Sequence, residues 1–96
     1  MSYELTGNIE TVYPKEQITG NFSKRRFVVE RVKELDGTQY TDYVKFIVFN
    51  KMCVALDEYE LGDTVKVFFD FTGNKYHFEG EMRYGSEVKC WKIEKV

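Results

Sequence analysis

The stretch Thr41–Phe49 separates into two sets of alternate side chains with different chemistry. One set is apolar and suits a hydrophobic core: Val44, Phe46 and Val48. The other set mixes aromatic rings with a cation: Thr41, Tyr43, Lys45, Ile47 and Phe49. Because a closed β-barrel buries one face of each strand, we expect the mixed set to point outward. Outward rings can stack on nucleic-acid bases, and an adjacent lysine can contact phosphate. The alternative is a row that lies under a loop or in a subunit interface.

The densest basic run of the chain, Lys24-Arg25-Arg26, opens a second expected strand. By alternation Phe27 and Val29 point to the core, so Lys24 and Arg26 point outward beside the mixed set. These two cations are candidate phosphate contacts, although a basic run also suits a solvated strand end. Phe22, just before the run, is a candidate stacking ring or a plug on the end of the barrel.

A third group of rings and cations lies in residues 75–86, a segment that we expect to be a loop or an irregular hairpin. The candidate binding residues in it are Tyr76, Phe78, Arg83 and Tyr84. A loop that carries rings and cations can fold over a single strand of nucleic acid. The alternative is a hairpin whose rings pack on one another. Trp91 is assigned a structural role, because both faces of its strand are plausible core faces.

The inventory of catalytic and metal-ligating side chains is small. His77 is the only histidine, and Cys53 and Cys90 are far apart with no CxxC motif, so we expect neither a metal site nor a cofactor. No motif supplies a nucleophile with a base, so the sequence predicts no catalytic residues and no enzyme. The two cysteines are expected to be reduced, packed thiols.

The length of 96 residues predicts a single domain over residues 1–96 and excludes a two-domain enzyme. With 43% apolar and 31% charged residues, the chain has the composition of a folded domain. The net charge of −2 argues against binding nucleic acid by bulk positive charge, but it leaves room for a local basic groove. No apolar run suits a membrane helix or a signal peptide, so we expect a cytoplasmic protein.

The expected elements follow from the period of the apolar residues. Alternation with period two predicts strands over 3–13, 24–32, 39–49, 63–72 and 87–94. A helical stripe predicts one short helix over 51–59, which Gly62 ends. Asp36-Gly37 and Gly73-Asn74 are expected turns, 14–23 an expected loop, and Gly7 an expected bulge or sharp bend. The sequence therefore predicts an all-β, five-stranded OB-fold barrel with one short helix between strands three and four, against an open β-sandwich or an SH3-like barrel.

Two families resemble this sequence. The stretch 41–51 and the segments 57–59 and 61–65 resemble the third strand, the helix end and the next strand start of bacterial single-stranded DNA-binding proteins. The segments 3–9, 26–30 and 88–95 resemble, over nearly the whole length, the small DUF3127 family of single-domain OB-fold proteins of Bacteroidetes and their phages.

The resemblance implies a stacking role for Tyr43 and Phe49 and a phosphate contact for Lys45. It also implies a homo-oligomer, a dimer or tetramer. Asn50 replaces the glycine that the DNA-binding family has after the strand-three phenylalanine. The chain ends at Val96 without that family's long acidic tail, so we expect binding without recruitment of partner proteins.

The residues and the resemblance together predict a protein that binds single-stranded DNA with little sequence preference, with roles in replication or repair. RNA remains a possible ligand, because no feature reads a 2′-hydroxyl. The alternative function is an OB-fold protein-interaction module, for example a subunit of a replication or phage assembly. In that case the outward aromatic row would be the core of an interface.

Overall fold

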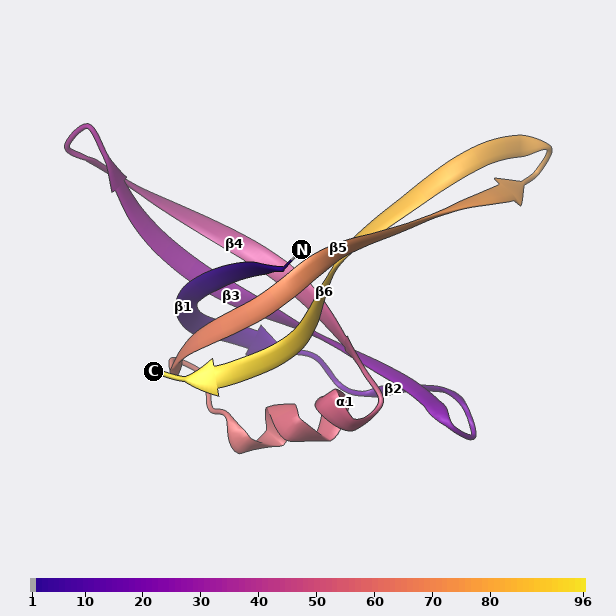
Figure 1. The fold of residues 1–96 in the computed structure, drawn as a ribbon, viewed down its shortest axis with the longest axis horizontal. Coiled ribbons are helices and arrows are strands. Elements are labelled where there is room, and N and C mark those ends of the chain that lie inside the picture. Colours follow the sequence, from indigo (N-terminus) through magenta and orange to yellow (C-terminus); the bar gives the residue numbers. More distant parts are fainter. Residues whose placement is uncertain (1) are drawn as a thin grey trace.

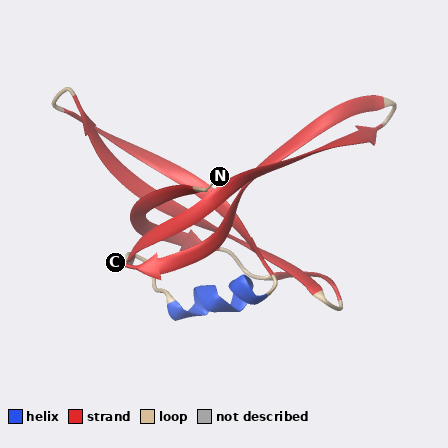
Figure 2. Ribbon diagram, viewed as in Figure 1, coloured by secondary structure: helices blue, strands red, loops and turns tan. Residues whose placement is uncertain are grey.

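A computed structural model describes residues 2–96 and contains six strands and one short helical segment (Figure 1). The strands are β1 (Tyr3–Val12), β2 (Glu16–Thr19), β3 (Phe22–Leu35), β4 (Thr38–Phe49), β5 (Thr64–Phe78) and β6 (Glu81–Lys95). The helix α1 (Lys51–Ala55) continues into a 3₁₀ turn (Leu56–Glu58). Figure 2 shows that strands make up most of the chain and that the helical segment lies below them, at one end of the barrel.

Five of the strands close into a barrel. The sheet order is β1-β5-β6-β4-β3-β2, and β1 also pairs with β3. The strand β1 reaches both neighbours because its first half pairs with β5 and its second half with β3. Gly7 lies where the chain bends from one neighbour to the other, and a Cβ there would collide with the carbonyl oxygen of Glu30. Gly7 therefore permits a close approach of the two backbones, while the register irregularity of β1 lies further along, between Ile9 and Thr11.

The barrel core is apolar and is built from alternate residues of every barrel strand. Its fully buried side chains include Phe27 and Val29 of β3 and Phe46 and Val48 of β4, as the alternation predicts. Cys53 of α1 and Leu56 close one end of the core. Cys53 and Cys90 are buried free thiols, which confirms their predicted state.

One strand was not predicted. The segment Glu16–Thr19 lies in the expected loop but forms β2, which pairs with the start of β3 outside the barrel. All four of its residues are exposed, so it lacks the apolar alternation that marks a half-buried strand. Counting β2, the helix lies between the fourth and fifth strands, β4 and β5, and not between the third and fourth as predicted.

The connection between β5 and β6 also differs from the prediction. The β5–β6 ladder runs without interruption through Gly73 and Asn74 to the pair Phe78↔Glu81, and the chain turns at Glu79-Gly80. The expected irregular loop is thus a regular hairpin, which projects from the barrel at the upper right of Figure 1. The predicted turn at Asp36-Gly37 is confirmed, and both residues have positive φ.

Candidate nucleic-acid interface

The outer face of β3 and β4 carries most of the residues singled out in the sequence. The antiparallel register pairs Lys24 with Phe49, Arg26 with Ile47, Val28 with Lys45 and Glu30 with Tyr43. Directly paired residues point to the same side of a sheet. We call these eight residues the outer β3–β4 face; it lies opposite the face that packs into the core.

Two aromatic rings stack at one end of this face. The ring centroids of Phe22 and Phe49 are 5.6 Å apart with planes inclined by 22°. Phe22 is 36% exposed, and Phe49 is half-buried. Backbone hydrogen bonds hold the two segments together: Asn50 donates to the Ser23 carbonyl, and the Asn50 side chain accepts from the Ser23 N–H. The pair therefore presents a fixed aromatic surface of the kind on which a base can stack.

Asn50 stands at the position where the DNA-binding family has a glycine, and the structure shows what the asparagine side chain does there. Its φ of 52° lies in the left-handed region that glycine adopts most readily. With a ψ of −117°, however, the conformation is not the left-handed helical one that asparagine adopts readily. The substitution keeps the backbone turn and adds the side-chain hydrogen bond to Ser23.

A groove runs from the stacked rings to the base of the β5–β6 hairpin. It has a volume of about 390 Å³ and is lined by Phe49, Thr72, Gly73, Asn74, Gly85, Ser86 and Glu87. The hairpin residues in it are small, so one wall is largely backbone. A Cβ on Gly85 would lie 2.8 Å from the Asn74 Oδ1 atom and 3.8 Å from the Tyr76 ring. Glycine thus keeps the groove open where the hairpin leaves the barrel.

Three lysines around the groove carry unneutralised charge. Lys24 and Lys45 lie on the outer β3–β4 face, and the Lys89 Nζ atom lies 5.5 Å from the Phe49 ring centroid. Among residues 2–96, none of the three has a carboxylate oxygen within 4.0 Å. Such amines are available to contact phosphate.

Lys89 is a candidate residue that the sequence reasoning missed. Its neighbours Val88 and Cys90 pack in or against the core, so strict alternation alone places Lys89 on the outside. Its neighbour on the hairpin ladder is Asp70, but the ammonium group reaches toward Phe49 instead.

The two arginines of the basic run are paired with carboxylates. Arg26 NH1 lies 3.0 Å from Glu16, and its NH2 lies 2.7 Å from Glu87; these partners raise the pKa of Arg26 despite partial burial. Arg25 points to the helix, where it donates to the Cys53 carbonyl and binds Asp57 at 2.8 Å. Arg25 therefore anchors α1 and does not contribute to the outer β3–β4 face.

The middle of the face differs from the prediction, whereas Tyr43 at its far end points outward as expected. Ile47 belongs to the set expected to point outward, but it is only 2% exposed; its ladder partners are Arg26 of β3 and Lys89 of β6, whose long side chains flank it. Tyr43 is 60% exposed, and the nearby carboxylate of Glu30 raises the pKa of its phenol. Six residues of extended chain, about 20 Å, separate Tyr43 from Phe49. Tyr43 therefore lies beside negative charge and away from the groove.

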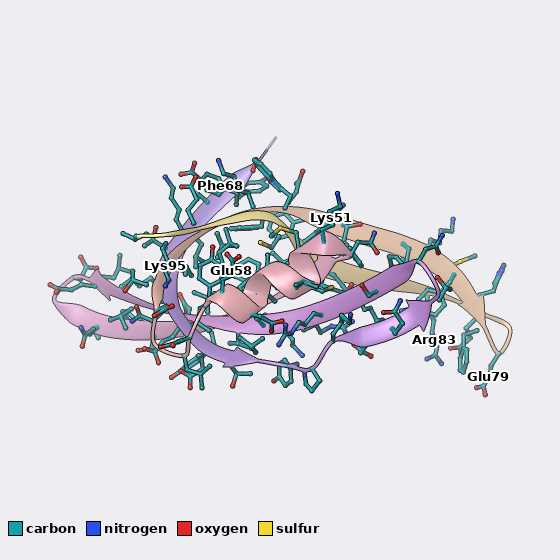
Figure 3. The ribbon with its side chains drawn as sticks, turned by 90° about the horizontal axis from the view of Figure 1, so that it is seen from below. Lys51, Glu58, Phe68, Glu79, Arg83 and Lys95 are labelled. Carbon is teal, nitrogen blue, oxygen red and sulfur yellow. The ribbon has the colours of Figure 1, made fainter. Side chains whose placement is uncertain are left out.

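The hairpin residues divide between its two faces. Tyr76 pairs with Arg83 and Phe78 with Glu81, so these residues share one face with Gly85, on the groove side. The Arg83 guanidinium lies 4.8 Å from the Phe78 ring centroid. Figure 3 shows Arg83 and Glu79 at the end of the molecule that this hairpin forms. Tyr84 pairs with Lys75 on the opposite face and is 74% exposed, so the structure does not bring it together with the other three.

Trp91 lies outside the groove. It is the unpaired residue of a bulge in β6, where Phe68 pairs with Lys92 and Phe69 with Cys90. Its indole packs on Phe68 with centroids 5.6 Å apart, and its N–H donates to the Ser2 hydroxyl. It is 48% exposed, so its structural contact covers only part of the ring.

The structure offers little for other kinds of site. Within residues 2–96, no three histidine, cysteine or acidic side chains are grouped as metal ligands. No helix in that range is both long and apolar enough to cross a bilayer. What the arrangement supplies is a set of exposed rings, amines and backbone, which suits the binding of a ligand.

Comparisons with known proteins agree with this architecture. A crystal structure of a small single-stranded DNA-binding protein from Streptomyces coelicolor is similar, with a TM-score of 0.62 over 100% of this chain and 94% of that one. At 14% identity this similarity concerns the fold. No curated protein sequence matches the chain. The family model described as a domain of unknown function, DUF3127, matches residues 4–94, and the chain belongs to that family.

Proposed function

We propose that this chain is a non-catalytic protein that binds single-stranded DNA with little sequence preference. The observation that carries the proposal is the exposed Phe22–Phe49 stack, which borders a groove and lies among the unpaired amines of Lys24, Lys45 and Lys89. An aromatic ring can stack on any base, and a lysine ammonium group can donate to any phosphate. This chemistry therefore favours a single strand without selecting its sequence.

In the proposed mode of binding, bases stack on Phe22 and Phe49 and the backbone follows the groove past Lys89. The groove side of the hairpin then extends the path to Tyr76, Phe78 and Arg83. A duplex keeps its bases stacked in pairs and cannot offer them to these rings. The name of the Streptomyces coelicolor protein supports the proposal, since a barrel of the same shape carries that description.

The first experiment is a titration of fluorescent oligo-dT of about 30 nucleotides, followed by anisotropy at several salt concentrations. If three lysines each neutralise one phosphate, log K should fall against log salt with a slope of about −2. Unlabelled duplex should fail to compete, and oligo-U tests for RNA. Affinity that does not change with salt, or a duplex that competes equally, would contradict the proposal.

A protein-interaction module is the second candidate. The observation that favours it is the exposure of large apolar side chains outside the groove, with Phe71 at 62% and Tyr84 at 74%. Such rings suit the centre of an interface, including one between copies of this chain in the expected dimer or tetramer. A partner-dependent mass with no shift on adding oligo-dT would favour this function.

A further inference from the structure

Arg26 lies in the middle of the outer β3–β4 face, but its guanidinium group is already paired with carboxylates. Two carboxylates from different strands bind it: Glu16 of β2 through NH1 at 3.0 Å, and Glu87 of β6 through NH2 at 2.7 Å. To reach Glu87, the arginine spans β4 above Ile47, its partner in the ladder. The three side chains are 29%, 52% and 39% exposed, so solvent reaches all of them.

Stability alone is a weak reason for this arrangement. Ion pairs that are this exposed contribute little to stability, because solvent screens them and ordering the side chains costs entropy. A guanidinium binds phosphate with the same planar pair of N–H donors that it offers to a carboxylate. Glu16 and Glu87 therefore occupy the donors that a phosphate would use.

The surroundings give a phosphate access to these donors. Two depressions flank Arg26, with volumes of about 250 and 340 Å³, and Lys45 lines both of them. Glu87 lines the first depression and also the groove beside Phe49. The carboxylate of Glu87 thus lies at the junction of the two hollows, along the path proposed for the DNA backbone.

We propose that Glu87, assisted by Glu16, is an internal competitor of the DNA backbone: it holds Arg26 in the free protein and a phosphate displaces it on binding. This inference rests on the proposed function and concerns its regulation. Glu87 lowers the affinity in two ways, because it occupies Arg26 and because it places a negative charge beside the incoming phosphates. The raised pKa of Arg26 agrees with a guanidinium held by two carboxylates.

The test is the substitution Glu87→Gln, which keeps the size of the side chain and one acceptor but removes the charge. In the wild type the phosphate replaces a carboxylate on Arg26, so this contact neutralises almost no additional charge. In Glu87→Gln the same contact neutralises about one additional phosphate, so the salt slope for oligo-dT should steepen by about 0.7. At 0.1 M salt the same term corresponds to binding about fivefold tighter than the wild type. Glu16→Gln should act in the same direction with a smaller effect, and it provides a second test if Glu87→Gln does not fold.

The matched control is Glu94→Gln. Glu94 lies on the same strand, is 46% exposed and pairs with Lys92 at 3.0 Å, away from the groove. Unchanged affinity in this control with tighter binding in Glu87→Gln supports the inference. Equal or weaker binding by a folded Glu87→Gln protein, or an equal gain in Glu94→Gln, overturns it. If neither the wild type nor any variant binds oligo-dT, the proposed function itself fails, whereas a wild type that binds as tightly as Glu87→Gln refutes the competitor alone.

Discussion

The Phe49 ring contacts or borders most features of the candidate nucleic-acid interface. It stacks on Phe22, borders the groove, lies under the Lys89 ammonium and pairs with Lys24 across the ladder. Its position at the last residue of β4, just before the turn at Asn50, fixes the ring from both sides. A ring held in this way loses little conformational entropy when a base stacks on it.

We therefore expect Phe49→Ala to weaken binding of oligo-dT by roughly 5- to 150-fold, the equivalent of the 1–3 kcal/mol that stacking one base contributes. The control is Tyr40→Ala, which removes a 47% exposed ring from the other face of the same strand. Anisotropy titration measures both, and thermal unfolding checks that each variant folds. Equal losses in the two variants would show that Phe49 has no special role.

The buried thiol of Cys90 makes stability depend on pH at the alkaline end. Burial raises its pKa from the ordinary 9.0 to about 12, so the folded chain keeps the thiol protonated while the unfolded chain ionises it. This contribution is complete below pH 9 and is lost as the pH rises toward 12, at up to about 1.4 kcal/mol per pH unit. In urea unfolding, the stability advantage of the wild type over Cys90→Ala should shrink over that range. A constant difference would contradict the pKa assignment.

Single residues were harder to place from the sequence than strands. Alternation correctly assigns Phe27 and Phe46 to the core and Arg26 and Lys45 to the outer face, because each strand has one face on the core. It fails at Ile47, which is buried between Arg26 of β3 and Lys89 of β6, a strand far along the chain. It also cannot show that Arg26 is paired with Glu16 and Glu87, since those contacts form only when β2, β3, β4 and β6 are assembled in one sheet.

At the scale of elements, the closure of the barrel depends on β1, which pairs with two neighbouring strands. The strand β1 pairs with β5 through Asn8 and with β3 from Asn8 onward, with a register shift between Ile9 and Thr11. The close approach at Gly7 lets the backbones meet at this corner. A side chain there would push β1 away from β3.

Gly7→Ala should accordingly destabilise the fold by about 1–3 kcal/mol, the usual cost of overpacking a well-packed site. Besides the Glu30 carbonyl, the added methyl would lie 2.7 Å from a methyl group of Val29. Gly20→Ala is the control, because its Cβ would have no neighbour within 4 Å. Urea unfolding of the two variants gives the comparison, and a Gly7→Ala protein as stable as the wild type would mean that β1 can shift without loss.

The elements that the sequence predicts best are those with one buried face. Strands β1, β3 and β4 and the helical segment lie close to the predicted ranges. The predictions end too early in β5 and begin too late in β6, because every residue of the β5–β6 hairpin from Asp70 to Tyr84 is exposed and no burial pattern marks it. Glycine and asparagine favour turns, so Gly73 and Asn74 suggest a turn. In the structure both residues are instead paired within the long β5–β6 ladder.

For the molecule as a whole, the net charge of −2 conceals an uneven distribution. All four arginines are in ion pairs with carboxylates, Arg25, Arg26, Arg31 and Arg83. Within residues 2–96, the side-chain cations left without a carboxylate partner are lysines, and three of them lie on the outer β3–β4 face or beside Phe49. The salt dependence of binding therefore measures how many cations at the interface are free to contact phosphate, and not the net charge of the chain.

The closure of the barrel between β4 and β6 has a mechanical consequence. These strands meet in parallel at one residue pair, Ile47↔Lys89, whereas every other junction of the barrel is a longer ladder. The barrel is thus closed between β4 and β6 by one residue pair, at the junction opposite β1. Phe49 lies on β4 and Lys89 on β6, so a DNA strand that binds as proposed and contacts both would hold these two strands together and resist the opening of the barrel.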